Sequence, residues 1–415
     1  MQLKDKSLHV LLLSAGKILS TPFGGEDLFS RSLGNWLAKM QKEVTLMGIE
    51  YAGMRVKHLT YLNVNSNNEA VANIEKKKNK VKKPVLGYLF YSLRTIIWIF
   101  QVFKILAINL RKPISIIHAQ DSGYTGLAAI VAGKILGIPV IITMHGIRYE
   151  QIESNPDVNK VIKKIALRIE RKLDVLTLGK ADLIIIVSST MKHYVQKIIA
   201  KTSVIYIPVA IKTKNFEYSE EKREMIRKEL GIHKDIKIVG FVGRLSYEKN
   251  LSTLLYSFAD AVNYNLSLKL VLVGEGPLEY ELRKQSRAIH IDDSVIFCGF
   301  RDDIDELLSG FDIFVLPSLI EGTSHALLEA MTCGRSIICS DIPANRELVT
   351  NDKNALLFNP NDNSGLSAAI TLLSTDETLR RKLGSNAKIV ASQYDEEIVF
   401  PRFVQCYHDL CEKKE

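Results

Sequence analysis

The feature that most constrains the fold of this chain is a regular alternation of short apolar runs with amphipathic stretches. The apolar runs are rich in Leu, Ile and Val and are nearly continuous, which is typical of strands buried on both faces of a sheet. The stretches between them have the periodicity of amphipathic helices. This alternation predicts an α/β protein in which helices cover both faces of parallel sheets.

The alternation runs through the chain twice, and the pattern lapses near residues 208–216. Strands are predicted in the first half at residues 8–13, 44–49, 114–118, 139–144, 183–187 and 204–207. Helices are predicted between them at residues 26–40, 124–136, 158–176 and 190–199. The second half repeats the plan, with strands at residues 236–242, 268–273, 295–298, 311–316 and 336–339. Its helices are predicted at residues 219–230, 251–262, 278–289, 304–308, 326–333 and 345–349.

Length and charge divide the chain at the same place. At 415 residues it is long for one domain. Residues 1–215 carry 32 Lys and Arg against 14 Asp and Glu, whereas residues 216–415 carry 23 against 32. We predict two doubly wound, Rossmann-like domains, residues 1–208 and 209–394, and the basic first domain should face an anionic partner. A last amphipathic helix lies within residues 395–415, and in proteins of this plan it often packs back on the first domain.

The N-terminus and the cysteines bear on location. A basic start followed by the apolar run 8–13 resembles a secretory signal peptide, but the run is short and is interpreted as the first buried strand. The five cysteines show neither paired nor metal-binding spacing, which is typical of a reducing compartment. A cytoplasmic protein is therefore expected.

Residues 76–110 form an unusual segment. Six lysines lie between residues 76 and 83, and an apolar, aromatic-rich stretch follows. Arg94 and Lys104 interrupt that stretch, so it falls short of the roughly 20 uncharged residues that span a bilayer. The segment could bind an anionic membrane surface, or it could be a core helix preceded by a solvated lysine loop. No known nucleic-acid-binding motif accompanies the basic residues, so a nucleic-acid partner is not expected.

Two glutamates follow the predicted strand 311–316, and seven residues separate them. Glu321 lies in a polar turn, and Glu329 lies about two turns into the next helix. Free amides at such a turn can bind a phosphate, while a deeper carboxylate can accept hydrogen bonds from vicinal hydroxyls. The pair therefore favours a nucleotide-sugar site; the alternative is a solvated loop residue and a surface helix residue.

Further candidates lie at other predicted strand ends, where ligands gather in open α/β sheets. Arg244 and Lys249 could hold a diphosphate after strand 236–242, although each could also be a solvated loop cation. Glycines that could bring backbone close to a ligand, or simply form tight turns, are Gly24, Gly25, Gly274 and Gly276.

Two histidines, His118 and His145, end neighbouring predicted strands, and either could contact a substrate or have a structural role. Asp303 and Asp305 match the DxD pattern of metal-dependent sugar transferases. They precede a predicted helix, where acidic residues interact favourably with the helix dipole, so they are not expected to bind metal.

Together these motifs resemble glycosyltransferase family 4, the retaining nucleotide-sugar transferases of the GT-B fold, in which two such domains face each other across a cleft. The resemblance covers nearly the whole chain and is strongest over residues 238–358. It implies that Arg244 and Lys249 bind the donor diphosphate, that Glu321 lies beside the donor sugar and that His145 contacts this sugar. It assigns the ribose hydroxyls to Glu329. The remaining donor-binding positions that it implies are Gly25, Phe300, Arg301, Gly322, Thr323, Ser324 and Leu327.

The resemblance implies a retaining, metal-independent transferase that uses a UDP- or GDP-sugar and no other cofactor. The basic first half favours a lipid-linked or otherwise anionic glycan acceptor at the cytoplasmic membrane face, as in envelope polysaccharide or glycolipid synthesis. Thr323-Ser324 and Pro343-Ala344 depart from the family pattern and leave the sugar open. The alternatives are a catalytically silent, membrane-associated nucleotide- or glycan-binding protein, a nucleotide-sugar epimerase and a sugar phosphorylase.

Overall fold

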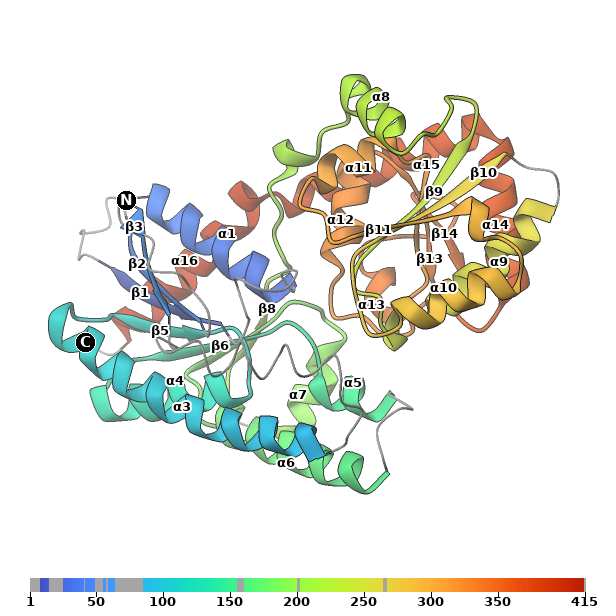
Figure 1. Ribbon diagram of the computed structural model, residues 1–415. Helices are drawn as coiled ribbons and strands as arrows, with labels where there is room; N and C mark the ends of the chain where they lie inside the picture. Colours follow the sequence, from blue (N-terminus) through green and yellow to red (C-terminus); the bar gives the residue numbers. More distant parts are fainter. Residues whose placement is uncertain are drawn as a thin grey trace.

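The computed structural model describes residues 8–14, 25–40, 42–48, 55–56, 59–63, 85–154, 160–199, 202–263 and 267–413. Within them the chain forms two helix-covered sheets, one from each half of the sequence (Figure 1). The predicted α/β architecture with two doubly wound sheets is thereby confirmed. Gly24 and the lysine cluster of residues 76–83 lie outside the described residues.

The first sheet has eight strands in the order β3-β4-β2-β1-β5-β6-β7-β8. Their bounds are β1 (His9–Leu13), β2 (Glu43–Gly48), β3 (Arg55–Val56), β4 (Leu59–Asn63), β5 (Ile116–Ala119), β6 (Val140–Met144), β7 (Leu183–Ile186) and β8 (Val204–Tyr206). Neighbours pair in parallel except β3 and β4, which form an antiparallel edge. The sequence did not predict these two strands, because they lack the long apolar runs of the central ones.

The helices of the first half are α1 (Gly25–Lys39), α3 (Val85–Arg111), α4 (Tyr124–Leu136), α5 (Arg148–Ser154), α6 (Lys160–Leu178) and α7 (Met191–Ile198). Both α3 and α6 pack against α4, so these three helices form one layer beside the sheet (Figure 1). None of the helices in the described ranges is both long and apolar enough to cross a membrane.

The second sheet has six parallel strands in the order β11-β10-β9-β12-β13-β14. Their bounds are β9 (Lys237–Val242), β10 (Leu268–Val273), β11 (Val295–Gly299), β12 (Ile313–Leu316), β13 (Ser336–Ser340) and β14 (Leu356–Phe358). The helices are α8 (Glu220–Glu229), α9 (Leu251–Asn263), α10 (Glu279–Ala288), α11 (Ile304–Gly310), α12 (His325–Thr332), α13 (Pro343–Arg346), α14 (Asn363–Thr375) and α15 (Glu377–Ala391). The strand order reverses between β9 and β12, where doubly wound sheets bind their ligands.

The last helix, α16 (Glu396–Glu412), lies against the first half rather than the second (Figure 1). Trp36 of α1 donates a hydrogen bond from Nε1 to Glu397 over 3.0 Å, and the rings of Phe29 and Phe400 pack edge to face. Two segments therefore connect the halves, and they pair where Ile211 forms a β-bridge with Asp395. The domain boundaries predicted from the sequence stay a proposal.

Candidate active site

Three loops meet at the carboxyl edge of the second sheet. A Cβ on Gly274, whose φ is +126°, would lie 2.0 Å from the carbonyl oxygen of Gly243, and one on Gly276 would lie 2.2 Å from that of Leu245. These two glycines therefore let the loop after β10 pack tightly on the loop after β9. The packed loop carries Arg244, whose exposed guanidinium has no hydrogen bond or ion pair with the residues that the structure describes.

Lys249 and Glu321, predicted separately as site residues, are in direct contact. The Nζ atom of Lys249 lies 2.5 Å from Oε1 of Glu321, and the Oγ of Ser318 donates to the same oxygen over 2.6 Å. The Glu321 side chain is only 8% exposed, so the ion pair is largely desolvated. The ion pair thus places one cation and one carboxylate side by side at the end of β12.

Helix α12 begins beside this ion pair. Ser324 caps it, because its Oγ accepts a hydrogen bond from the backbone N–H of Leu327 over 3.3 Å. The other amides of the first turn have no partner within the helix, so they can bind an anion. Glu329 lies farther along α12. Its side chain is buried and makes no hydrogen bond with any described residue, and burial raises its pKa to about 7.

The first half contributes His145, which directly follows β6. Its Nε2 lies 2.9 Å from the Oε1 of Gln120, and its ring packs edge to face on Phe29. Burial, with smaller effects of His325 and His118, lowers the pKa of His145 to about 3, so the imidazole is neutral at physiological pH. Gln120 was not predicted as a site residue, although it follows His118 by two residues at a strand end.

Behind Gln120, a buried chain of hydrogen bonds leads to the C-terminal helix. The Nε2 of Gln120 lies 3.2 Å from Nε2 of His118, whose Nδ1 lies 2.8 Å from the hydroxyl oxygen of Tyr407. Thr143 also contacts His118 Nε2, over 2.7 Å. His118 is fully buried, and burial lowers its pKa to about 3. Its role here is therefore structural, and direct contact with a substrate does not fit.

One proton arrangement follows from this orientation of the Gln120 amide. The amide group is a donor at Nε2 and an acceptor at Oε1. The neutral His118 ring must then accept at Nε2 and donate from Nδ1 to Tyr407. By the same reasoning His145 donates from Nε2 to Gln120, which leaves its Nδ1 unprotonated and able to accept a hydrogen bond.

The two halves touch at this site. A Cβ on Gly322 would lie 2.0 Å from the carbonyl oxygen of His145, so only glycine permits the observed approach. The hydroxyl of Thr323 donates to the carbonyl oxygen of Val187 over 3.1 Å. The turn after β12 is thus held directly against the strand ends of the first sheet.

A second contact between the halves involves Glu347, which directly follows α13. Its Oε1 accepts hydrogen bonds from Ser189 Oγ over 2.6 Å, from Ser188 Oγ over 3.0 Å and from the N–H of Thr190 over 3.1 Å. Glu347 lies within residues 238–358, where the resemblance is strongest, but the sequence did not predict that it would join the two halves.

His325 is a candidate that the sequence reasoning missed. It begins α12, and both of its ring nitrogens are buried without a hydrogen-bond partner among the described residues. Burial lowers its pKa to about 4, and the ring is close enough to His145 to help lower the pKa of that residue. Its position directly after Ser324, the residue that caps α12, could have identified it as a residue at the start of that helix.

Two further donor-binding positions implied by the resemblance, Phe300 and Arg301, follow β11. Phe300 is exposed, whereas the side chain of Arg301 donates to Asp303 from Nε over 2.7 Å and to Glu229 from Nη2 over 3.2 Å. The hydrogen bond from Arg301 lowers the pKa of Asp303. Asp305 forms an ion pair with Lys222. Both carboxylates of the DxD pattern are therefore engaged with basic side chains at the start of α11.

Two family models match this chain, and together they show the protein family to which it belongs. The family model described as "Glycosyl transferases group 1" matches residues 222–390, and that described as "Glycosyltransferase Family 4" matches residues 28–213. The chain belongs to glycosyltransferase family 4. This confirms the resemblance read from the strand-end motifs, and the two-sheet architecture is that of the GT-B fold.

Several curated relatives of this glycosyltransferase are enzymes. It is 24% identical over 310 residues to N-acetyl-alpha-D-glucosaminyl L-malate synthase of Bacillus anthracis, covering 74% of this chain and 78% of the relative. It is 31% identical over 291 residues to alpha-monoglucosyldiacylglycerol synthase of Streptococcus pneumoniae (68% and 65%). It is 29% identical over 301 residues to UDP-Gal:alpha-D-GlcNAc-diphosphoundecaprenol alpha-1,3-galactosyltransferase of Escherichia coli (70% and 73%).

Solved structures share the fold of the glycosyltransferase. Sucrose-phosphate synthase from Thermosynechococcus elongatus superposes with a TM-score of 0.81 at 20% identity, over 97% of this chain and 99% of that one. HepE from Anabaena in complex with UDP-glucose superposes with a TM-score of 0.71 at 18% identity, over 97% and 100%.

Proposed function

We propose that this glycosyltransferase moves a sugar from a UDP- or GDP-sugar to a lipid-linked or polysaccharide acceptor, with retention of anomeric configuration. The proposal rests above all on the state of Glu329, whose buried carboxylate has no hydrogen-bond partner among the described residues. A carboxylate in that state destabilises the free protein until a donor reaches it. Two vicinal ribose hydroxyls supply such donors.

The neighbouring groups suit the rest of a nucleotide-sugar. The start of α12 can hold a diphosphate together with the guanidinium of Arg244, which has no partner among the described residues. Lys249 can exchange part of its contact with Glu321 for a phosphate oxygen, because an ammonium has three donors. Glu321 would then accept hydrogen bonds from the sugar, and the exposed ring of Phe300 is available beside the base.

The proposed reaction exchanges one bond at the anomeric carbon for another on the same face. The bond from that carbon to the diphosphate oxygen breaks as the bond to the acceptor oxygen forms, and the acceptor proton passes to the leaving diphosphate. Arg244 and Lys249 would stabilise the negative charge that develops on the diphosphate. We propose that these two cations take the place of a divalent ion, so that transfer continues in the presence of EDTA.

His145 would orient the donor sugar. With Nε2 donating to Gln120, its Nδ1 presents a lone pair that can accept a hydrogen bond from a sugar hydroxyl. Because the ring is held neutral, this acceptor is available across the physiological pH range.

The acceptor proposal rests on the first half and on the relatives. Two relatives are named for a diacylglycerol glycolipid and for a diphosphoundecaprenol-linked sugar. Helix α3 exposes Ile99, Phe100 and Phe103, and α6, which packs on the same helix α4, is rich in exposed basic residues. An apolar and basic face of this kind suits the inner surface of an anionic membrane. We therefore propose that the enzyme acts at the cytoplasmic membrane face as a peripheral protein.

The first test is a thermal-shift panel of UDP, GDP, ADP and their sugars without added metal. A selective shift by one nucleoside diphosphate that disappears in Glu329→Ala supports the donor site. Release of that nucleotide from its sugar only with a lipid-linked acceptor would support the transferase. A shift with no turnover would indicate a silent binder. Turnover without acceptor would indicate an epimerase, and a requirement for inorganic phosphate would indicate a phosphorylase.

Membrane docking is tested separately by sedimentation with vesicles. Wild-type protein should sediment with phosphatidylglycerol vesicles and not with phosphatidylcholine vesicles, and Phe100→Ser with Phe103→Ser should reduce the bound fraction. Tyr280→Ser is the matched control, because Tyr280 is an exposed aromatic residue of the second half. Equal binding of all variants would contradict docking through α3.

A further inference from the structure

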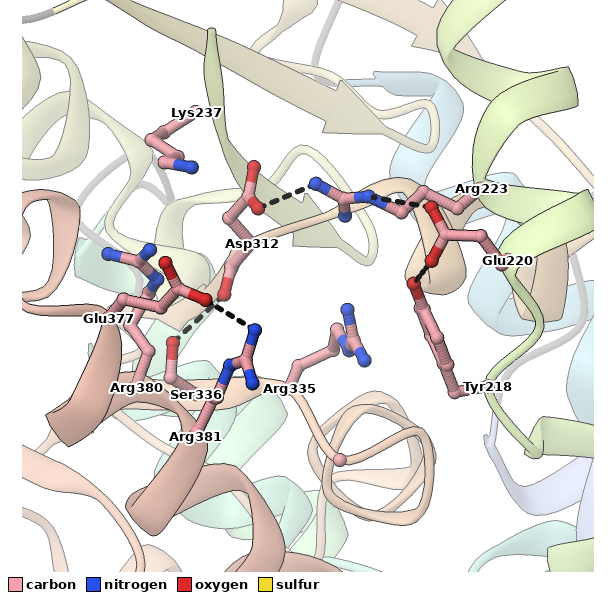
Figure 2. Close-up of a pocket in the computed structure, with 11 residues that line it drawn as sticks. Tyr218, Glu220, Arg223, Lys237, Asp312, Arg335, Ser336, Glu377, Arg380 and Arg381 are labelled. Carbon is pink, nitrogen blue, oxygen red and sulfur yellow. Dashed lines mark hydrogen bonds and ion pairs between the residues drawn. The ribbon is translucent and has the colours of Figure 1, made fainter. Parts of the chain in front are cut away.

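A cavity of about 480 Å³ lies at the edge of the second sheet opposite the candidate active site (Figure 2). Lys237 begins β9, Asp312 directly precedes β12 and Ser336 begins β13, so the amino ends of three strands form one side of it. Helices α8 and α15 contribute the other walls. A strand as long as β9 spans roughly 20 Å, so the cavity is separate from the site at the carboxyl edge.

The cavity carries an excess of positive charge. Five basic side chains and three carboxylates line it. Each carboxylate already has a basic partner: Asp312 lies 2.8 Å and Glu220 3.9 Å from Arg223, and Glu377 lies 2.5 Å from Arg381. The remaining basic residues have no carboxylate partner among the residues that the structure describes. They are Lys237, Arg335 and Arg380.

Two of these three side chains are fixed in place before any ligand binds. Arg335 donates to the carbonyl oxygen of Phe311 over 2.9 Å, and its guanidinium lies 4.5 Å from the centre of the Tyr218 ring. Arg380 donates to the carbonyl oxygen of Ser374 over 3.1 Å. Each guanidinium has five N–H groups, so donors remain for a ligand. Because the side chains are already ordered, a ligand would lose little of its binding energy in ordering them.

Lys237 differs from the two arginines. Within the described ranges its ammonium makes no hydrogen bond and no ion pair, although Figure 2 shows it beside the same space as Asp312 and Arg380. The carbonyl contacts of Arg335 and Arg380 can be explained as helix and loop capping. The ammonium of Lys237 has no such contact with a described residue, so all three of its donors are available to an anion in the cavity.

We propose that this cavity binds a small phosphorylated molecule that carries at least two negative charges. Five basic and three acidic side chains leave the lining with an excess of two positive charges, so balance requires more than one negative charge. Planar guanidinium groups match phosphate oxygens in pairs. The volume lies within the range of about 300–1,000 Å³ that is usual for small-molecule sites. The site goes beyond the proposed transfer reaction and does not depend on it.

Inorganic pyrophosphate is the probe, titrated by calorimetry into the full-length protein at low ionic strength. Lys237→Gln should weaken binding at this site roughly tenfold or more, since it removes a charged hydrogen bond without disturbing any contact that holds the fold. Arg380→Gln should do the same. Lys234→Gln, at an exposed lysine three residues away, is the matched control and should stay within about twofold of wild type. Arg244→Ala should weaken any binding of pyrophosphate at the donor site. It should leave the affinity of the cavity for pyrophosphate unchanged.

The proposal is wrong if pyrophosphate does not bind. It is also wrong if pyrophosphate binds equally well to Lys237→Gln, Arg380→Gln and Lys234→Gln. A parallel titration with vesicles containing phosphatidic acid tests a lipid head group as the source of the phosphate. If the vesicles bind through Lys237 and pyrophosphate does not bind, the small-molecule assignment is wrong.

Discussion

The hydroxyl oxygen of Tyr407 lies 2.8 Å from Nδ1 of His118, although 289 residues separate them in sequence. Through His118 and Gln120 this contact reaches His145 at the candidate active site. The last helix of the chain therefore helps to decide which nitrogen of His145 carries its proton.

Replacing Tyr407 by Phe should alter catalysis from a distance. Loss of the hydroxyl leaves His118 free to exchange tautomers, and the Gln120 amide can then reverse. We expect kcat to fall about tenfold with KM for the donor little changed, and the free energy of unfolding to fall by about 1 kcal/mol. The nitrogen chemical shifts of His145 should report a changed tautomer. The control is Tyr394→Phe, outside this chain of contacts; equal effects of both variants would contradict the relay.

Arg244→Ala tests the diphosphate role. The guanidinium is exposed and has no partner among the described side chains, so its removal should leave Tm unchanged. We expect turnover to fall on the order of 100-fold, because the charge on the leaving group loses a stabilising cation. Steady-state kinetics with Arg287→Ala as a surface control checks this. Turnover within threefold of wild type would show that Arg244 does not bind the diphosphate.

Lys249→Ala should differ from Arg244→Ala in its effect on stability. It removes the ion-pair partner of Glu321, whose side chain is only 8% exposed. An uncompensated carboxylate in that position should lower the free energy of unfolding by about 1–3 kcal/mol, in addition to the loss of rate. Denaturant unfolding of Lys249→Ala and of the double variant with Glu321→Gln separates the two effects. The double variant should recover much of the stability and none of the rate.

The pH dependence of nucleotide affinity should report Glu329. Burial raises its pKa to about 7 in the free protein, and ribose hydroxyls that donate to the carboxylate should lower this pKa in the complex. Affinity for UDP or GDP is then highest above pH 7 and falls as the pH decreases below 7. The fall should be severalfold between pH 7.5 and about pH 6. Calorimetric titrations of Glu329→Gln should show only the pH dependence of the nucleotide itself.

The same burial predicts a stabilising variant. Because the folded protein raises the pKa of Glu329 above its ordinary value of 4.5, the stability gained with the neutral form is complete below pH 4.5 and is lost as the pH rises through 7. At pH 8 without nucleotide, the free energy of unfolding of Glu329→Gln should therefore exceed that of wild type by roughly 1–3 kcal/mol. The variant should accordingly unfold at a higher temperature. Melting curves at pH 5 and pH 8 test this, and a gain that is equal at both values would argue against burial as the cause.

Gly322→Ala should separate nucleotide binding from transfer. The added methyl group would lie 2.0 Å from the carbonyl oxygen of His145, so the halves cannot keep their present contact. We expect nucleotide affinity within about twofold of wild type, since that part of the site lies on the second half, and a loss of kcat near 100-fold. Unchanged kcat would mean that the contact of Gly322 with His145 is absent during the reaction.

Much of the fold could be predicted because the central strands are continuous apolar runs with motifs at their carboxyl ends. The edge strand β3 and the terminal strand β14 are short, and β4 (Leu59–Asn63) is interrupted by polar residues, so none of the three shows a continuous apolar run. Helices α14 and α15 were omitted although Asp362 and Asp376 cap them by accepting from Gly365 N–H and Leu379 N–H. Those two aspartates were a readable signal that the prediction did not use.

Site residues could be predicted only where a charged residue or histidine follows closely after a predicted strand. Lys249 and Glu321 were both predicted, but their contact depends on how two loops fold over one sheet edge. The contact of His118 and Gln120 with Tyr407 has no local sequence pattern, since His118 and Tyr407 lie 289 positions apart in the sequence. His325 lay inside the strongest motif and was missed because its environment, rather than its residue type, makes it unusual.

The bridge between Ile211 and Asp395 means that the second half is an insertion with two anchored ends rather than a body on a single tether. Ile211 N–H donates to Tyr394, and Glu396 N–H donates back to Ile211, so the two crossings are bonded to each other. Two crossings that are bonded to each other constrain the relative placement of the halves more than a single linker would. They therefore help to hold Gly322 against the carbonyl oxygen of His145.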